Sequence, residues 1–153
     1  MRGREVVVKE EVCKYSFLPE RKYELMEQII SMKYEGKKQY QIRFVGGERI
    51  IPKDEIVFIE SFGRKLHFHL LHDEYILYQK LDDAENKFND SDFLRIHQSY
   101  LVNMFFIERI ASYKAHLITG KMLSVPKARY PYVKKRYHDW KKGLGMQGDK
   151  ISI

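Results

Sequence analysis

The chain of 153 residues contains a single cysteine, Cys13, and no long hydrophobic stretch. One cysteine excludes a disulfide within the chain and is typical of a reducing compartment. No segment reaches the roughly 18 apolar residues that a membrane-spanning helix needs, and the amino terminus lacks an apolar signal core. We therefore expect a soluble, cytoplasmic protein that has no membrane partner.

The sequence also lacks the common motifs of catalytic and nucleotide-binding sites. It contains no G-x-S-x-G, no phosphate loop of the G-x-x-x-x-G-K type and no H-E-x-x-H. Residues 143–148 match G-x-G-x-x-G, but they follow a basic segment, and the five remaining residues are too few for the next helix of a dinucleotide-binding unit. His97 and Ser99 would diverge on a tight turn, and no acidic residue adjoins them. We expect no catalytic residue and no cofactor.

Three histidines are the candidate metal ligands. Alternate residues of a strand share a face, so His67 and His69 could hold one cation, while His72 would face the other way. The nearest carboxylates, Asp73 and Glu74, belong to the expected turn. We favour a position on the solvent face of a sheet, or at a phosphate, over a metal site. A metal-dependent enzyme remains the alternative that these histidines leave open.

Positive charge is concentrated at the carboxyl end of the chain. The whole chain has a net charge of +7, and residues 126–153 hold eight basic and two acidic residues, a net charge of +6. Such a cluster can neutralise phosphates and gain affinity through counterion release. A solvated basic helix that keeps the protein soluble explains the charge equally well.

Hydrophobic periodicity predicts a mostly β chain from about residue 38. Alternation of apolar and polar residues marks strands at 39–45, 49–51, 56–61, 66–70, 107–113, 116–118 and 122–125. Residues 75–78 lead into a helix expected near 79–88. An amphipathic basic helix is expected from Pro131 to Gly143, with a flexible tail at 143–153.

Residues 1–37 are interpreted as a strand–helix extension. Val6–Val8 predict a short strand, and apolar residues at helical spacing predict a helix from Pro19 to Gly36. Its apolar stripe includes Leu25 and Ile29. The stripe must pack against the following domain, against a second copy of the chain or against an upstream domain.

The stretch FLRIHQSYLVN at 93–103 interleaves polar and apolar residues too regularly for a loop. We interpret it as a presented recognition element, in which apolar side chains anchor a short helical turn. The anchoring residues are Phe93, Ile96, Tyr100 and Val102. The side chains left for hydrogen bonding are Arg95, His97, Gln98, Ser99 and Asn103.

These eleven residues, with IVFIES at 56–61 and MLSVPK at 122–127, resemble the LytTR (LytR/AlgR-type) DNA-binding domain of bacterial transcription regulators. The family pattern is roughly F-x-R-x-H-x-S-x-x-V-N, preceded by an I-x-x-I-E-S strand and followed by a small-residue strand that ends near a basic residue. The resemblance covers about residues 38–140. It implies an elongated domain of small antiparallel sheets at 38–142, preceded by the extension at 1–37.

The resemblance implies a sequence-specific transcription regulator that reads successive major grooves of double-stranded DNA through loop residues. Gln98 matches a base reader, Arg95 and His97 would hold the turn or reach the DNA backbone, and Ser99 is a further DNA-binding side chain. Asn103 is expected to cap the turn. The structural alternatives are an ion pair of Arg95 with Asp90 or Asp92, and a core position for His97.

Two more reading positions follow from the resemblance. One lies in the loop after the I-E-S strand, at Arg64 or Lys65. The other follows the third block at Lys127 and Arg129, because Pro126 replaces a residue that is often polar in the family.

Many members of the family are response regulators with a phospho-receiver domain, which does not fit into residues 1–37. The strand and helix expected there are similar to the last strand and helix of a receiver. We expect a homodimer on repeated DNA sites, with this helix as a candidate contact. The alternative is a protein-interaction or sensor module of the same fold, whose basic segment binds acidic protein or lipid headgroups.

Overall fold

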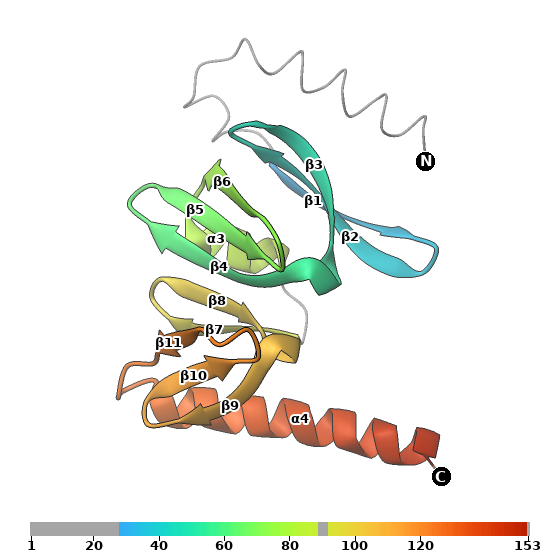
Figure 1. Ribbon diagram of the computed structural model, residues 1–153, viewed down its shortest axis with the longest axis vertical. Coiled ribbons are helices and arrows are strands. Elements are labelled where there is room, and N and C mark those ends of the chain that lie inside the picture. Colours follow the sequence, from blue (N-terminus) through green and yellow to red (C-terminus); the bar gives the residue numbers. More distant parts are fainter. Residues whose placement is uncertain (1–27, 89–91, 153) are drawn as a thin grey trace. The chain divides into compact units, whose positions relative to one another are not determined.

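The computed structural model of the protein describes residues 28–88 and 92–152 (Figure 1). The chain forms two compact units, and the boundary between them in the sequence falls between Lys87 and Phe88. About half of the described residues lie in short antiparallel strands, and two α-helices accompany them. None of the helices in the described ranges has both the length and the apolar character needed to cross a membrane.

The amino-terminal unit begins with three strands, β1 (Ile29–Tyr34), β2 (Lys37–Phe44) and β3 (Gly47–Pro52), paired in that order. Tyr34 pairs with Lys37, so Glu35 and Gly36 alone form the turn between β1 and β2. Both have positive φ, +53° and +78°, which suits the right-handed twist of a hairpin. Ile29 and Ile42 are paired and fully buried.

The helix predicted from Pro19 to Gly36 is wrong at residues 29–34, which form β1. Apolar residues recur there at helical spacing, but the turn at Glu35 and Gly36 brings β2 alongside as an antiparallel partner. Pairing satisfies the backbone hydrogen bonds of both strands. The rest of that helix, and the strand predicted at Val6–Val8, lie outside the described residues.

A 3₁₀ turn, η1 (Lys53–Glu55), leads into the second sheet of this unit. Its strands are β4 (Ile56–Phe62), β5 (Lys65–Leu70) and β6 (Glu74–Tyr78), in the order β6-β5-β4. Helix α3 (Leu81–Lys87) follows and packs against β1 and β4 with Leu81 and Ala84 buried. The strands predicted for β2 to β5 and the helix at 79–88 are confirmed. Periodicity did not separate β6 from that helix.

The carboxyl-terminal unit contains the hairpin of β7 (Phe93–His97) and β8 (Tyr100–Asn103), followed by η2 (Met104–Phe106). Strands β9 (Ile107–Ala111), β10 (Lys114–Leu117) and β11 (Met122–Ser124) form a sheet in the order β11-β10-β9. Helix α4 (Tyr130–Ser152) ends the unit. The three strands predicted for β9 to β11 are confirmed, but the turn between β9 and β10 lies at Ser112 and Tyr113, inside the range 107–113 predicted for the first of them.

Two predictions for this unit are wrong. Residues 93–103 form a hairpin instead of a helical turn, because β7 and β8 pair along their length across a turn at Gln98 and Ser99. Helix α4 continues through Gly143 and the two glycines that follow it, since each glycine costs a helix only about 1 kcal/mol relative to alanine. No proline follows to stop it. The domain limits at 37/38 and 142/143 stay predictions.

Helix α4 is anchored by two residues one helical turn apart. Val133 is fully buried, and the Tyr137 hydroxyl donates to the carbonyl of Ile107 at 2.8 Å. Burial raises the pKa of the Tyr137 phenol above its usual value of 10.0, and the nearby Glu108 carboxylate raises this pKa further. The folded chain therefore favours the neutral phenol.

This shift predicts a loss of stability at alkaline pH. Because the folded pKa lies above the unfolded one, the stabilising contribution is complete below about pH 10 and is lost as pH rises through the folded pKa. Tyr137→Phe should cost roughly 1 kcal/mol at neutral pH through the lost hydrogen bond, yet show a shallower alkaline decline. Urea unfolding of both proteins between about pH 8 and 11 measures this. Equal declines would contradict the assignment.

Candidate nucleic-acid interface

The turn between β7 and β8 presents Gln98 to solvent. The Arg95 side chain braces the turn, because its Nε donates to the carbonyl of His97 at 2.9 Å and its Nη2 to the carbonyl of Gln98 at 2.6 Å. The backbone carbonyls just before and just after the Gln98 Cα are thus tied to one planar guanidinium. This leaves the Gln98 amide, with its donor and acceptor, exposed on a fixed backbone.

His97 holds the same turn from its other side. The Ser99 backbone N–H donates to His97 Nδ1 at 2.9 Å, so this nitrogen is the acceptor and carries no hydrogen. The imidazole lies 4.9 Å from the Tyr100 ring and is half-buried. The imidazole thus contacts the turn and the neighbouring tyrosine, and it is only half-buried, which differs from a core histidine.

Arg129 joins the segment before α4 to the β7–β8 hairpin. Its Nε donates to the carbonyl of Arg95 at 3.0 Å. Lys127, two residues earlier, is exposed, and its Nζ lies 5.8 Å from the centre of the Tyr113 ring. Within the carboxyl-terminal unit, hydrogen bonds therefore link Arg95, His97, Gln98, Ser99 and Arg129, and Lys127 is two residues from Arg129 in the chain.

Arg64 and Lys65 belong to the amino-terminal unit, at the turn between β4 and β5. Gly63 has a φ of +65° there, and Arg64 is exposed beside Phe62, whose side chain is 71% exposed. Lys65 Nζ lies 5.4 Å from the centre of the Tyr78 ring. The turn combines a basic and an aromatic side chain in contact with solvent.

Asn103 caps η2, as expected. Its side-chain oxygen accepts from the Phe105 N–H at 3.2 Å, and the residue is only 1% exposed. A buried amide that satisfies the backbone after the hairpin has a structural role.

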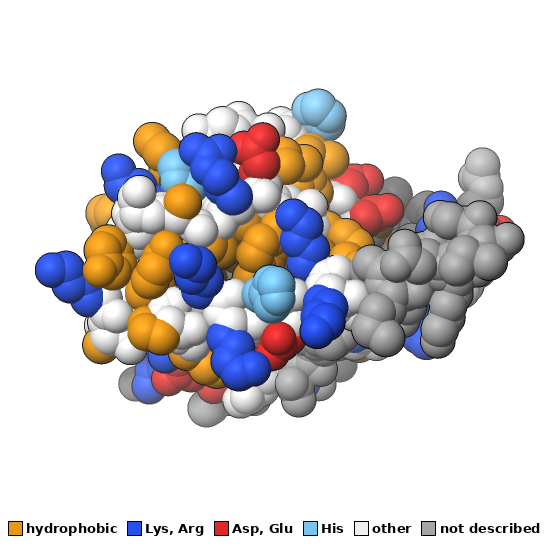
Figure 2. Space-filling view, turned by 90° about the horizontal axis from the view of Figure 1, so that it is seen from below, with side chains coloured by type: hydrophobic (Ala, Val, Ile, Leu, Met, Phe, Trp, Pro, Cys, Tyr) orange, Lys and Arg blue, Asp and Glu red, His pale blue; other side chains and the backbone are white. Residues whose placement is uncertain are grey.

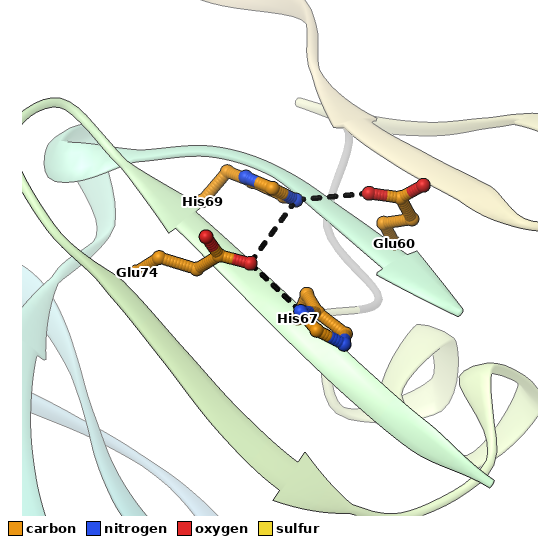
Figure 3. Close-up of polar contacts among 4 residues, drawn as sticks. All are labelled: Glu60, His67, His69 and Glu74. Carbon is orange, nitrogen blue, oxygen red and sulfur yellow. Dashed lines mark hydrogen bonds and ion pairs between the residues drawn. The ribbon is translucent and has the colours of Figure 1, made fainter. Parts of the chain in front are cut away.

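Figure 3 shows His67 and His69 on one face of the β4–β5–β6 sheet, which confirms their predicted common face. His67 Nδ1 lies 2.7 Å from Glu74 Oε2, and His69 Nε2 lies 3.0 Å from Glu60 Oε1 and 3.9 Å from Glu74 Oε2. In the ranges that the structure describes, no three His, Cys, Asp or Glu side chains are arranged to hold a metal ion. The four residues form cross-strand polar pairs on the sheet.

Glu60 was not among the sequence candidates, although it directly precedes the serine of the IVFIES block. The contact of its side chain with His69 follows from the strand register, which places Glu60 opposite His67 in β5. A register can be deduced only when the length and type of the intervening turn are known.

Figure 2 shows the side of the molecule that carries α4, where Lys and Arg side chains lie between hydrophobic ones. Not every cation there is equally available. Lys135 Nζ lies 2.9 Å from Asp139 Oδ2, and this hydrogen bond holds the pKa of the Asp139 carboxyl below its usual value. Lys134 and Lys141 instead lie over tyrosine rings, at 5.7 Å from the ring centres of Tyr130 and Tyr137.

Small antiparallel sheets, a basic terminal helix and polar side chains on braced turns are typical of a nucleic-acid-binding module that reads through loops. Residues 46–138 match the sequence profile of the LytTr DNA-binding domain. The match covers more than half of the chain, and the chain belongs to this family. It is a family of DNA-binding domains and not of enzymes.

The chain is also similar to individual proteins. It is 28% identical over 94 residues to the transcriptional regulatory protein NatR of Bacillus subtilis (strain 168). The aligned segment covers 58% of this chain and 40% of NatR. The chain thus spans less than half the length of that relative. The LytTr DNA-binding domain of a methyl-accepting/DNA response regulator from Bacillus cereus has the same fold, with a TM-score of 0.55 and 16% identity over 72% of this chain and 97% of that chain.

Proposed function

We propose that the chain is a sequence-specific, DNA-binding transcription regulator in which Gln98 reads a base. The observation that supports this most strongly is the braced turn in a chain of this family, with an exposed amide and a backbone held by Arg95. A glutamine amide can donate to N7 of adenine and accept from its N6 amino group as a matched pair in the major groove. This geometry requires the glutamine backbone to be held still. Arg95 and His97 supply that support.

The remaining basic residues have a different proposed role. Lys127 and the cations of α4 neutralise phosphates and so position Gln98 over the groove, while the Ser99 hydroxyl bonds a base or a phosphate. Arg64 and Lys65 on the β4–β5 turn provide a further contact, in the next groove. No step of this function requires catalysis or a cofactor.

Two copies of the chain on repeated sites would bind DNA more tightly and recognise a longer DNA sequence than one small domain can. We extend the proposal to a homodimer on DNA, in the cytoplasm of a bacterium, within the response-regulator class. The similarity to a transcriptional regulatory protein supports the general role.

Selection of bound duplexes from a random DNA pool, at near-physiological salt, tests the proposed function. We expect an enriched motif that occurs as a repeat. Enrichment of nothing beyond base composition would reject it and favour the alternative, a protein-interaction or sensor module whose basic segment binds acidic protein or lipid headgroups. Salt-sensitive binding alone does not separate the two, whereas preference between sequences at equal salt does.

Lys127→Ala is expected to weaken binding to all duplexes alike. The exposed ammonium neutralises one phosphate, so its loss should reduce the slope of log affinity against log salt by roughly one unit without changing sequence preference. Titrations of the selected and a scrambled duplex at several salt concentrations measure both effects. Lys33→Ala, which removes an exposed lysine from β1, is the charge-matched control and should leave the slope unchanged. A loss confined to the selected duplex would make Lys127 a base reader instead.

A further inference from the structure

The turn between β9 and β10 has an unusual backbone. Ala111 pairs with Lys114, which leaves Ser112 and Tyr113 as the whole turn, with φ values of +55° and +60°. Hairpin turns of this type normally use Asn-Gly or Asp-Gly, because other residues pay about 1–2 kcal/mol to adopt the left-handed region. A tyrosine held there needs a reason, and strained residues of this kind gather at functional sites.

The strained turn places the Tyr113 ring at the start of α4. The ring centre lies 4.6 Å from that of Tyr130, and the Tyr113 carbonyl accepts from the Val125 N–H at 2.9 Å. Lys127 Nζ lies 5.8 Å from the Tyr113 ring centre, and Lys134 Nζ lies 5.7 Å from that of Tyr130. We call Tyr113, Lys127, Tyr130 and Lys134 the aromatic–basic cluster.

The cluster is open to solvent and positively charged. Tyr113 is 47% exposed, and both lysines are exposed. The first turn of α4, all of it within the described residues, contains no acidic side chain. The ammonium groups of Lys127 and Lys134 are thus held over ring faces, with no acid in that turn to neutralise them.

A DNA strand fits this chemistry, because it alternates an anionic phosphate with the carbon surface of a deoxyribose. Lysine can bond the phosphate, and an exposed ring can pack against the sugar. The cluster also has a fixed connection to the Gln98 turn. Lys127 is two residues from Arg129, which bonds the Arg95 carbonyl, and Arg95 in turn bonds the carbonyl of Gln98.

We propose that the aromatic–basic cluster is a clamp for the DNA backbone beside the Gln98 turn. In this account Tyr113 is the positioning residue, and the strain in the β9–β10 turn is retained because it sets the Tyr113 ring against Tyr130 and under Lys127. The inference rests on the proposed function and adds to it a contact that recognises the backbone without reading a base.

Tyr113→Gly separates this role from a role in folding. Glycine adopts a φ of +60° without strain, so the variant should unfold in urea at no lower concentration than the wild type. Without the ring, the dissociation constants of the selected and the scrambled duplex should both rise, by about three- to tenfold, with the preference between them unchanged. Ser112→Gly relieves strain in the same turn and keeps the ring, so it should bind DNA like the wild type. Tyr113→Phe should also retain binding.

Each contrary result has a separate meaning. If the wild type selects a motif but Tyr113→Gly binds it equally well, the clamp is rejected and the proposed function stands. If the wild type selects no motif, the proposed function itself fails. A lower urea midpoint for Tyr113→Gly would assign the turn to folding, and a changed sequence preference would assign Tyr113 to the Gln98 turn; both overturn the clamp. Binding to phosphatidylserine vesicles that depends on Tyr113, with DNA binding unaffected, would also overturn it in favour of a lipid surface.

Discussion

Gln98→Ala is expected to lower affinity for the selected DNA site by about 1–3 kcal/mol, roughly 5- to 150-fold, the usual effect of losing a bidentate contact to a base. The amide is exposed, and the carbonyls of His97 and Gln98 both bond Arg95, so the substitution removes a side chain and leaves the backbone in place. Fluorescence anisotropy with the selected and a scrambled duplex, at one salt concentration, measures the change.

The loss should fall on the selected duplex and leave the scrambled one almost unchanged. Asn86→Ala, which removes an exposed amide at the end of α3, is the matched control and should have no effect on either duplex. If Gln98→Ala keeps the wild-type ratio between the two affinities, Gln98 is not a base reader.

Arg95→Ala is expected to lower affinity for the selected duplex by at least about tenfold, although Arg95 itself need not touch DNA. Its guanidinium bonds the carbonyls of His97 and Gln98. Hydrogen bonds to charged groups contribute about 1.5–3 kcal/mol each, so the turn should become mobile when both are lost. DNA binding would then have to order Gln98, and the free-energy cost of that ordering would lower the affinity.

The comparison of Arg95→Ala with Arg95→Lys distinguishes a brace from a phosphate contact. Lysine restores the charge, but its ammonium cannot reproduce the planar fork that reaches two carbonyls from separate nitrogens. We therefore expect Arg95→Lys to recover little specific affinity, and hydrogen exchange at the Ser99 amide to be faster in both variants. Full recovery by lysine, with equal changes on all duplexes, would show that Arg95 acts on phosphate.

Much of the fold could be predicted from the sequence, because half-buried antiparallel strands alternate apolar and polar residues. This holds for β2 to β5 and for the β9–β10 hairpin. Prediction from alternation fails at β1, because Ile29 and Ile30 fit a helical stripe as well as a strand. The strand forms because the turn at Glu35 and Gly36 brings the segment against β2.

The candidate site was predictable in its position but not in its contacts. The pattern at 93–103 marks Gln98, Arg95 and His97, yet periodicity suggested a helical turn where the chain forms a hairpin. The bonds from Arg95 to two carbonyls depend on that hairpin. Tyr113 gave no signal, because a Ser-Tyr pair does not indicate a left-handed turn.

The most direct test of the central claim pairs Gln98→Ala with single base-pair changes across the selected site. If Gln98 reads a base, one A·T pair should show a coupling energy of about 1–3 kcal/mol with Gln98. Replacing that base pair should weaken DNA binding by the wild type but hardly affect binding by Gln98→Ala. Changes at distant positions should add to the effect of Gln98→Ala. Simple additivity at every position of the site would contradict the account, because it would mean that Gln98 contacts no base.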